Sequence, residues 1–188
     1  MFYLQLGFEH IADLRGYDHI LFIISLCAVY TFHQWKKVLI LVTAFTIGHS
    51  VTLALATLKI IRIPTDLVEF LIPLTIFITA FANIFNKTEN FSNSHHLFKY
   101  FMALIFGFIH GMGFSNFLRS ILGNEDSILL PLLSFNVGLE IGQIFIVFII
   151  LSLAYLVIDL FRYSRREWTL ILSGAGIGVS LILMLERI

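Results

Sequence analysis

SILLPLLSFNVGLEIGQIFIVFIILSLAYLVIDLF, residues 127–161, decides the fold, because it is almost continuously apolar over 35 residues. A helix needs only about 20 such residues to cross a bilayer, so this segment predicts a span that tilts, kinks near Pro131 or Gly138, or projects beyond the membrane. Similar apolar runs recur along nearly all of the 188 residues, of which 59% are hydrophobic and 13% charged. We therefore predict an all-α, polytopic transmembrane helical bundle, with residues 1–188 forming a single transmembrane domain.

Polar breaks divide the rest of the chain into further expected spans. Residues 2–14 are amphipathic but too short to cross a bilayer, which predicts a short interfacial or partly buried N-terminal helix. A polar loop is expected at 86–96. The count is about six spans, or seven if the N-terminal segment embeds, with expected boundaries at 17–32, 38–58, 65–85, 97–122, 127–161 and 168–185.

Charge and cysteine content exclude several classes of protein. Formal net charge is zero, so nothing suggests nucleic-acid binding, and the one cysteine, Cys27, excludes an intrachain disulfide and a cysteine-rich metal site. The first ten residues lack the basic and apolar regions of a cleavable signal. Lys and Arg divide seven to five between the two sides of the expected spans, which predicts both termini outside the cytoplasm. The expected location is the bacterial inner membrane.

Ionisable and amide side chains inside the apolar runs are the main indication of function. A charge at the centre of a bilayer costs about 2.5–3.5 kcal/mol on insertion scales, so such residues normally face a protein interior or a water path. With the predicted topology, those of four spans reach similar depths, which predicts that they line one cavity in the outer half of the membrane. These residues are Asp18, His19, His49, His110, Asn136, Glu140 and Gln143.

Two pairs near the N-terminus combine a histidine with an aspartate. His10 and Asp13 stand at i,i+3 and so share a helix face, and Asp18 directly precedes His19. An aspartate beside a histidine can bind a metal itself or orient the imidazole. The ordinary alternatives are a solvated interfacial helix for the first pair and helix N-capping by Asp18 for the second.

Histidines within the second and fourth expected spans, His49 and His110, are harder to explain as ordinary structure, although a structural hydrogen bond remains an alternative for each. The glycines flanking His110 form a small-xxx-small pair that ordinarily serves helix packing. Asn136, Glu140 and Gln143 recur at i,i+4,i+7 and so form one polar face. Glu140 can be a metal ligand, a proton-carrying carboxylate or a structural group.

Five segments of this chain resemble, in order and spacing, those of the HupE/UreJ family, small membrane proteins associated with nickel or cobalt supply to hydrogenase and urease. The segments are HIADLRGYDHILF (10–22), TAFTIGHSVTLAL (43–55), VEFLIPLTI (68–76), FGFIHGMGF (106–114) and FNVGLEIGQ (135–143). The resemblance covers nearly the whole chain. It implies that a metal role falls on His10, Asp18, His19, His49, His110 and Glu140.

The favoured hypothesis is a permease for a divalent transition metal, because imidazole and carboxylate ligands suit Ni²⁺, Co²⁺ or Zn²⁺. The ligand core is expected to be Asp18, His19, His49 and His110. Glu140 would be a further ligand or a proton acceptor, and Asn136 and Gln143 would support the ligands by hydrogen bonding. The partners expected are the metal ion and the lipid bilayer.

Two other functions fit the same residues. A membrane-embedded zinc hydrolase would use Glu140 or Asp18 as general base with Ser50 nearby, on a lipid, lipoprotein or membrane peptide. A metal-stabilised accessory subunit would bind a membrane complex, or another copy of the chain, without transport or turnover. A permease needs a site that opens to both sides in turn, whereas an enzyme needs a tightly held metal.

Overall fold

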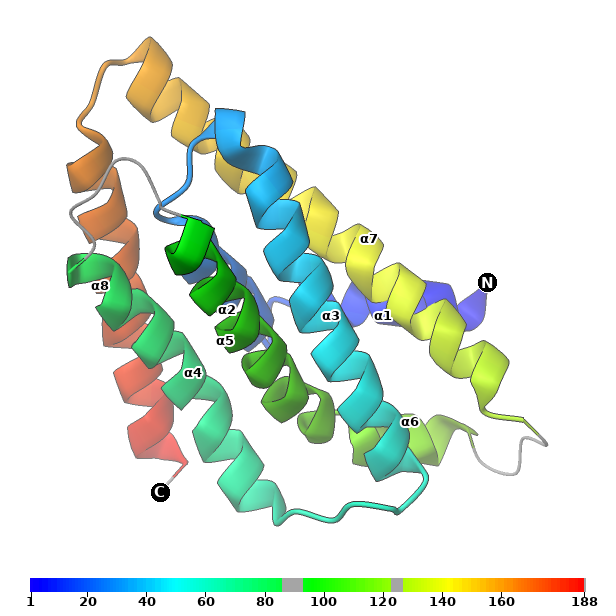
Figure 1. The fold of residues 1–188 in the computed structure, drawn as a ribbon. Helices are drawn as coiled ribbons and strands as arrows, with labels where there is room; N and C mark the ends of the chain where they lie inside the picture. Colours follow the sequence, from blue (N-terminus) through cyan, green and yellow to red (C-terminus); the bar gives the residue numbers. More distant parts are fainter. Residues whose placement is uncertain (86–92, 123–126, 188) are drawn as a thin grey trace.

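A computed structural model describes residues 1–85, 93–122 and 127–187, and every regular element in them is helical, which confirms the all-α class. Residues 86–92 of the expected loop 86–96 lie outside the described residues, whereas residues 93–96 belong to the first helical turn of α5 and so were wrongly expected to be loop. Figure 1 shows the helices as a bundle around the short helix α2. The principal helices are α1 (Phe2–Ala12), α2 (Asp18–Cys27), α3 (Trp35–Thr57), α4 (Thr65–Phe85), α5 (Asn93–Gly113), α6 (Ser115–Leu122), α7 (Leu129–Ala154) and α8 (Arg165–Glu186).

Four described helices are long and apolar enough to cross a membrane, namely α3 with its preceding turn, α4, α7 with its continuation, and α8. Helices α5 and α6 add a fifth span if they are counted together, although they meet at a bend of 50°. The expected span 17–32 is represented by α2, whose 10 residues are too few to cross a bilayer alone. The six-span count therefore remains a prediction, while the chain is an integral membrane protein.

The long apolar segment forms one extended helix rather than a kinked one. Helix α7 continues into a π-helical stretch, Tyr155–Leu160, and runs obliquely past the other helices (Figure 1). Pro131 lies in the first turn, where a backbone N–H would have no intrahelical partner, so it does not break the helix. At Gly138, the missing side chain instead leaves room for the Leu4 carbonyl of α1.

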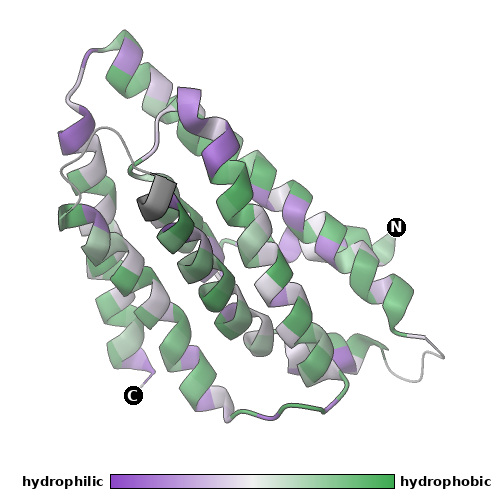
Figure 2. Ribbon diagram, in the orientation of Figure 1, coloured by the Kyte–Doolittle hydropathy of each residue, from purple (hydrophilic) through white to green (hydrophobic). Residues whose placement is uncertain are grey.

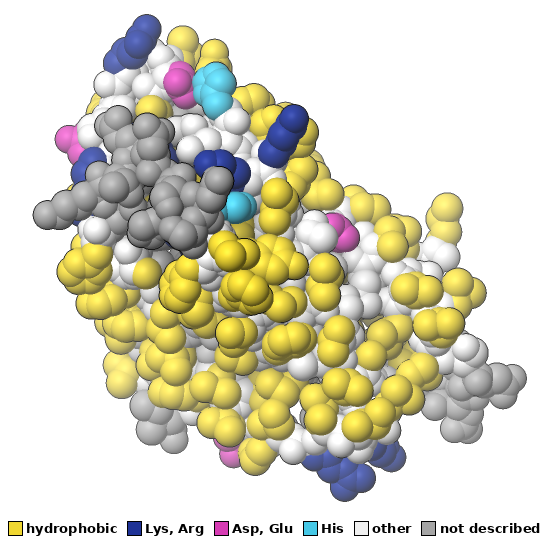
Figure 3. Space-filling view, in the orientation of Figure 1, with side chains coloured by type: hydrophobic (Ala, Val, Ile, Leu, Met, Phe, Trp, Pro, Cys, Tyr) yellow, Lys and Arg dark blue, Asp and Glu magenta, His cyan; other side chains and the backbone are white. Residues whose placement is uncertain are grey.

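The surface has the polarity of a membrane protein. Apolar residues dominate the middle of the helices in Figure 2, and Figure 3 shows a broad band of hydrophobic side chains between basic groups at the two ends of the molecule. Large apolar side chains such as Phe148 of α7 and Ile171 of α8 are exposed. Because water would disfavour so large an apolar surface, the band is the part that contacts lipid.

Candidate metal centre

Helix α1 carries His10 into the bundle by lying directly against α7. A side chain at Gly7 would collide with the backbone carbonyl of Phe135, and one at Gly138 would collide with that of Leu4. The two helices can approach this closely only because each has a glycine at the contact. His10 then stacks against Phe114 and Phe135, with ring centroids 3.9 and 5.7 Å away.

Helices α3 and α5 bring His49 and His110 together by the same means. Side chains at Gly48 and Gly107 would collide with the backbone of the opposite helix, and one at Gly111 would collide with the His49 carbonyl. The glycines beside His110 therefore do serve packing, and this packing places the two histidines in one layer. His49 is fully buried and His110 is 1% exposed.

Helix α2 supplies His19 from its first turn. Residues 13–17 are not helical, so the chain turns between α1 and α2 and returns towards the same interior. The His19 ring lies 4.7 Å from that of His10, 6.0 Å from that of His49 and 5.0 Å from that of His110, between ring centroids. We call these four histidines, each from a different helix, the histidine centre.

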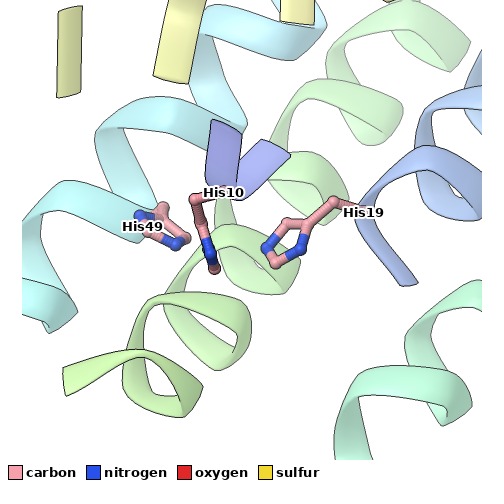
Figure 4. Close-up of side chains that lie close together, drawn as sticks. All are labelled: His10, His19 and His49. Carbon is pink, nitrogen blue, oxygen red and sulfur yellow. The ribbon is translucent and has the colours of Figure 1, made fainter. Parts of the chain in front are cut away.

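Three members of the histidine centre already have the spacing of a metal-binding group. Ligand atoms of His10, His19 and His49 all lie within 4.8 Å of one another, and Figure 4 shows His10 between the other two rings. Nitrogens bound tetrahedrally to zinc at about 2.0–2.1 Å would lie roughly 3.3 Å apart. To share one ion, the three imidazoles would have to move closer by up to about 1.5 Å.

The nitrogens of the histidine centre are short of hydrogen-bond partners. Among the described residues, none bonds Nε2 of His10, Nε2 of His19 or either ring nitrogen of His49. Buried polar groups normally have partners, and leaving one without costs about 1–3 kcal/mol. A bound cation would satisfy several of these nitrogens at once.

His110 is hydrogen-bonded to Thr75, a residue that the sequence analysis did not select. The Thr75 hydroxyl donates its one hydrogen to the Ile72 carbonyl at 2.7 Å. With that bond made, the hydroxyl would accept from Nε2 of His110, 3.0 Å away. In this arrangement Nε2 would carry the proton, and Nδ1, which has no hydrogen-bond partner among the described residues, would keep its lone pair available for a metal.

Asp18 is bonded to a residue far along the chain. Its Oδ2 accepts from Nη2 of Arg187 at 3.1 Å, while Nη1 of the same arginine donates to the Glu69 carbonyl at 3.0 Å. That carbonyl is available because Pro73, four residues further on, has no N–H to donate to it. Arg187 thus joins α2 to α4. The expected metal role of Asp18 remains a prediction.

The polar face of α7 meets α3 rather than the rings of the histidine centre. Thr43 donates to Oε1 of Glu140 at 2.8 Å, and Thr46 donates to Oε1 of Gln143 at 2.6 Å. Thr43 precedes His49 by six residues, or about 9 Å of helix. Asn136 Oδ1 is buried with no partner among the described residues. From α7, it is Phe135 that contacts the centre, 6.4 Å from the His49 ring.

Other residues considered from the sequence lie outside the centre. Asp13 follows the end of α1, is exposed, and accepts from the Arg15 backbone N–H at 2.8 Å. Ser50 donates to the Thr46 carbonyl at 2.6 Å, the ordinary bond of a hydroxyl in a helix. The hydrogen bond between Thr75 and His110 had no signal in the sequence beyond a threonine close after a proline.

The interior of this multihelical membrane protein brings together histidines from separate helices. The chain therefore belongs to the class of integral membrane proteins with a candidate transition-metal centre. Comparison with known protein families places the chain more closely. The family described as HupE / UreJ protein matches residues 1–187, and the chain belongs to that family. No curated protein and no solved structure gives a significant match.

Proposed function

We propose that this protein is a permease for a divalent transition metal of the nickel or cobalt type, and that the histidine centre is its intramembrane binding site. One observation carries the proposal: four helices direct histidines to one buried place, where three of them have ligand atoms within 4.8 Å. Membership of the HupE/UreJ family, which relates to nickel and cobalt handling, supports the same class of cargo.

The donor atoms favour borderline metals. Neutral imidazole suits Ni²⁺, Co²⁺ and Zn²⁺, whereas Ca²⁺ and Mg²⁺ prefer oxygen ligands. The centre's surroundings are largely aromatic, with Phe45, Phe114 and Phe135 in contact with its rings. A site lined by aromatic rings binds a metal through a few directed lone pairs, and selection among metals then depends on ligand type and geometry.

A cavity beside α1 offers a route from the surface to the centre. Its volume is about 760 Å³, and His10 is part of its wall. The charged residues lining it are Glu9, Asp13 and Arg15, so the cavity carries one net negative charge. Carboxylates at its mouth would attract a cation, and His10 would pass the ion to His19 and His49.

The hydrolase alternative has less support. It needs a general base beside the metal, yet the carboxylate of Asp18 pairs with Arg187, that of Glu140 accepts from Thr43, and the Ser50 hydroxyl bonds a backbone carbonyl. A three-histidine zinc centre nevertheless suits hydrolysis. The accessory-subunit alternative also requires a bound metal, but it predicts no transport of that metal across the membrane.

The first test measures bound metal. The protein is purified without added metal and analysed by elemental mass spectrometry beside His49→Ala and His110→Ala, with His33→Ala as the control from a turn outside the centre. We expect little retained metal, but reversible Ni²⁺ or Co²⁺ binding that only the two centre variants abolish. Vesicles containing the wild-type protein should then take up the ion, and those with His49→Ala should not.

Other outcomes would redirect the proposal. Unaltered binding in both centre variants would remove the histidine centre from the argument. One tightly held zinc per chain, lost in both variants and accompanied by no uptake, would favour the hydrolase or the accessory subunit. If the wild-type protein transports no metal and His49→Ala abolishes association with a partner protein, the accessory-subunit alternative is supported.

A further inference from the structure

A second cavity lies where α3 ends, α4 begins and α6 packs, on the far side of the α5–α6 bend from the cavity that His10 lines. Its volume is about 420 Å³. The described residues that line it include three cations, Lys59, Arg62 and Arg119, and no aspartate or glutamate. Thr65, the first residue of α4, also lines it, and the start of a helix adds partial positive charge. The cavity is therefore suited to an anion and unsuited to the metal cargo.

Lys59 reaches this position at a conformational cost. Its φ is 61°, in the left-handed region that favours glycine. It follows the end of α3, where the Ile60 N–H bonds the Leu55 carbonyl and its own N–H bonds the Ala56 carbonyl. This is the Schellman arrangement, whose left-handed position is usually glycine. A lysine there places a cation at the cavity where glycine would be the less strained choice.

Arg119 has hydrogen-bonding capacity left over. Its Nη2 donates to the Ala56 carbonyl at 2.7 Å, which holds the guanidinium against the end of α3. Its Nε is buried and has no partner among the described residues. A guanidinium held in place at one nitrogen has further N–H donors, and arginine matches phosphate geometry with two parallel donors, so Arg119 suits an oxyanion.

The rim of the cavity is apolar. Ile61 and Ile63 are among its lining residues, and Leu58 and Ile60 beside it are 53% and 66% exposed. The cavity is also at an end of the apolar band, because α3 ends and α4 begins there and both are candidate membrane spans. Cations beside exposed aliphatic side chains at the edge of the apolar band can bind a phospholipid. Its phosphate would lie among the cations and its acyl chains along the rim of the cavity.

We propose that this cavity binds the phosphate headgroup of an anionic phospholipid through Lys59, Arg62 and Arg119. The bound headgroup joins the end of α3 to the start of α4 and to α6, and its negative charge reduces the repulsion among the three cations. The site is separate from the histidine centre and does not depend on the cargo of the protein.

The experiment uses native mass spectrometry of the full chain with phosphatidylglycerol, phosphatidylcholine and inorganic phosphate as probes. We expect wild-type protein to retain one phosphatidylglycerol at least tenfold more strongly than phosphatidylcholine. Lys59→Gln/Arg62→Gln should lose this preference, and Lys36→Gln/Lys37→Gln, at the start of α3 and the other end of the molecule, should keep it. Displacement of the lipid by millimolar phosphate would show a site for soluble anions and overturn the lipid assignment.

Lys59→Gly separates binding from folding. It relieves the left-handed backbone while it removes the cation, so the unfolding temperature in detergent should stay equal or rise while phosphatidylglycerol retention falls severalfold. Unchanged retention in both Lys59→Gly and the double variant would overturn the proposal. Equal losses in the Lys36→Gln/Lys37→Gln control would overturn it as well, since the binding would then be unspecific. Nickel or cobalt binding should be unchanged in all these variants.

Discussion

Thr75 acts on the histidine centre through a single hydrogen bond. Since its hydroxyl accepts from Nε2 of His110, Thr75→Val leaves the imidazole free to rotate and to take the other tautomer. Groups that orient metal-binding histidines typically contribute 10- to 100-fold in affinity, and we expect a loss of about that size. Isothermal titration of Ni²⁺ or Co²⁺ into purified protein measures it.

Thr79→Val is the matched control for that change. Thr79 lies one turn further along α4, and its hydroxyl donates only to the Thr75 carbonyl. Affinity should therefore stay within about twofold of wild type, because no group of the centre loses a partner. If the two valine variants weaken binding equally, Thr75 acts through α4 as a whole and the tautomer argument is wrong.

Asp18 and Arg187 form an ion pair that we expect to stabilise the fold. The bond between them is partly buried, with side-chain exposures of 15% and 24%. Asp18→Asn and Arg187→Gln should each lower the free energy of unfolding by about 1–3 kcal/mol, and the double variant should cost less than the sum. Chemical denaturation of the four proteins completes the cycle. If the two losses in the free energy of unfolding are strictly additive, the pair contributes nothing to stability. If Asp18→Asn alone loses metal binding, the result supports Asp18 as a ligand.

Which residues would be close together could be predicted only in part. Burying a histidine in an apolar span costs free energy, so such residues are rare and usually functional. His49 and His110 could therefore be selected from the sequence as candidate functional residues. The position of Glu140 could not be predicted, because it depends on how α7 packs against α3. A shift of that contact by one residue moves the Glu140 carboxylate by about 1.5 Å along the helix. Arg187 was not foreseen either, since no local pattern connects it to Asp18.

At the scale of helices, the α3–α5 contact determines the position of two histidines. Gly107→Ala puts a methyl group against the Phe45 carbonyl, and the backbones must separate to accept it. Overpacking of this kind costs about 1–3 kcal/mol, and the separation should also weaken metal binding because His49 and His110 move apart. Thermal unfolding and metal titration measure the two effects.

The control for this helix contact is Gly174→Ala. Gly174 and Gly178 form a small-xxx-small pair in α8 that the sequence alone cannot distinguish from the pair around His110, yet nothing lies within 4 Å of a methyl group at either. Gly174→Ala should therefore leave stability and metal binding unchanged. A loss equal to that of Gly107→Ala would mean that α8 packs against a further chain. The comparison also shows why glycine spacing predicts a possible contact and not its partner.

At the scale of the whole molecule, the fold class followed from hydropathy, because bilayer thickness sets how long an apolar helix must be. The span count did not follow as directly. The 17–32 segment was expected to cross the membrane, and this stays a prediction, because the 10 residues of α2 are too few to cross a bilayer alone. A short helix inside a protein interior can have the same apolar composition as one that crosses lipid, so composition cannot separate the two cases.

The histidine centre should also stabilise the molecule that forms it. Its residues come from α1, α2, α3 and α5, so an ion held there joins helices that are distant in sequence, and it binds the folded state in preference to the unfolded one. At a free metal concentration 100 times the dissociation constant, binding adds about 2.7 kcal/mol to the free energy of unfolding. Thermal unfolding in detergent should therefore shift upwards with added Ni²⁺ or Co²⁺ and return on chelation. His49→Ala should abolish the shift and His33→Ala should retain it. A shift that survives in His49→Ala would place the stabilising ion elsewhere in the protein.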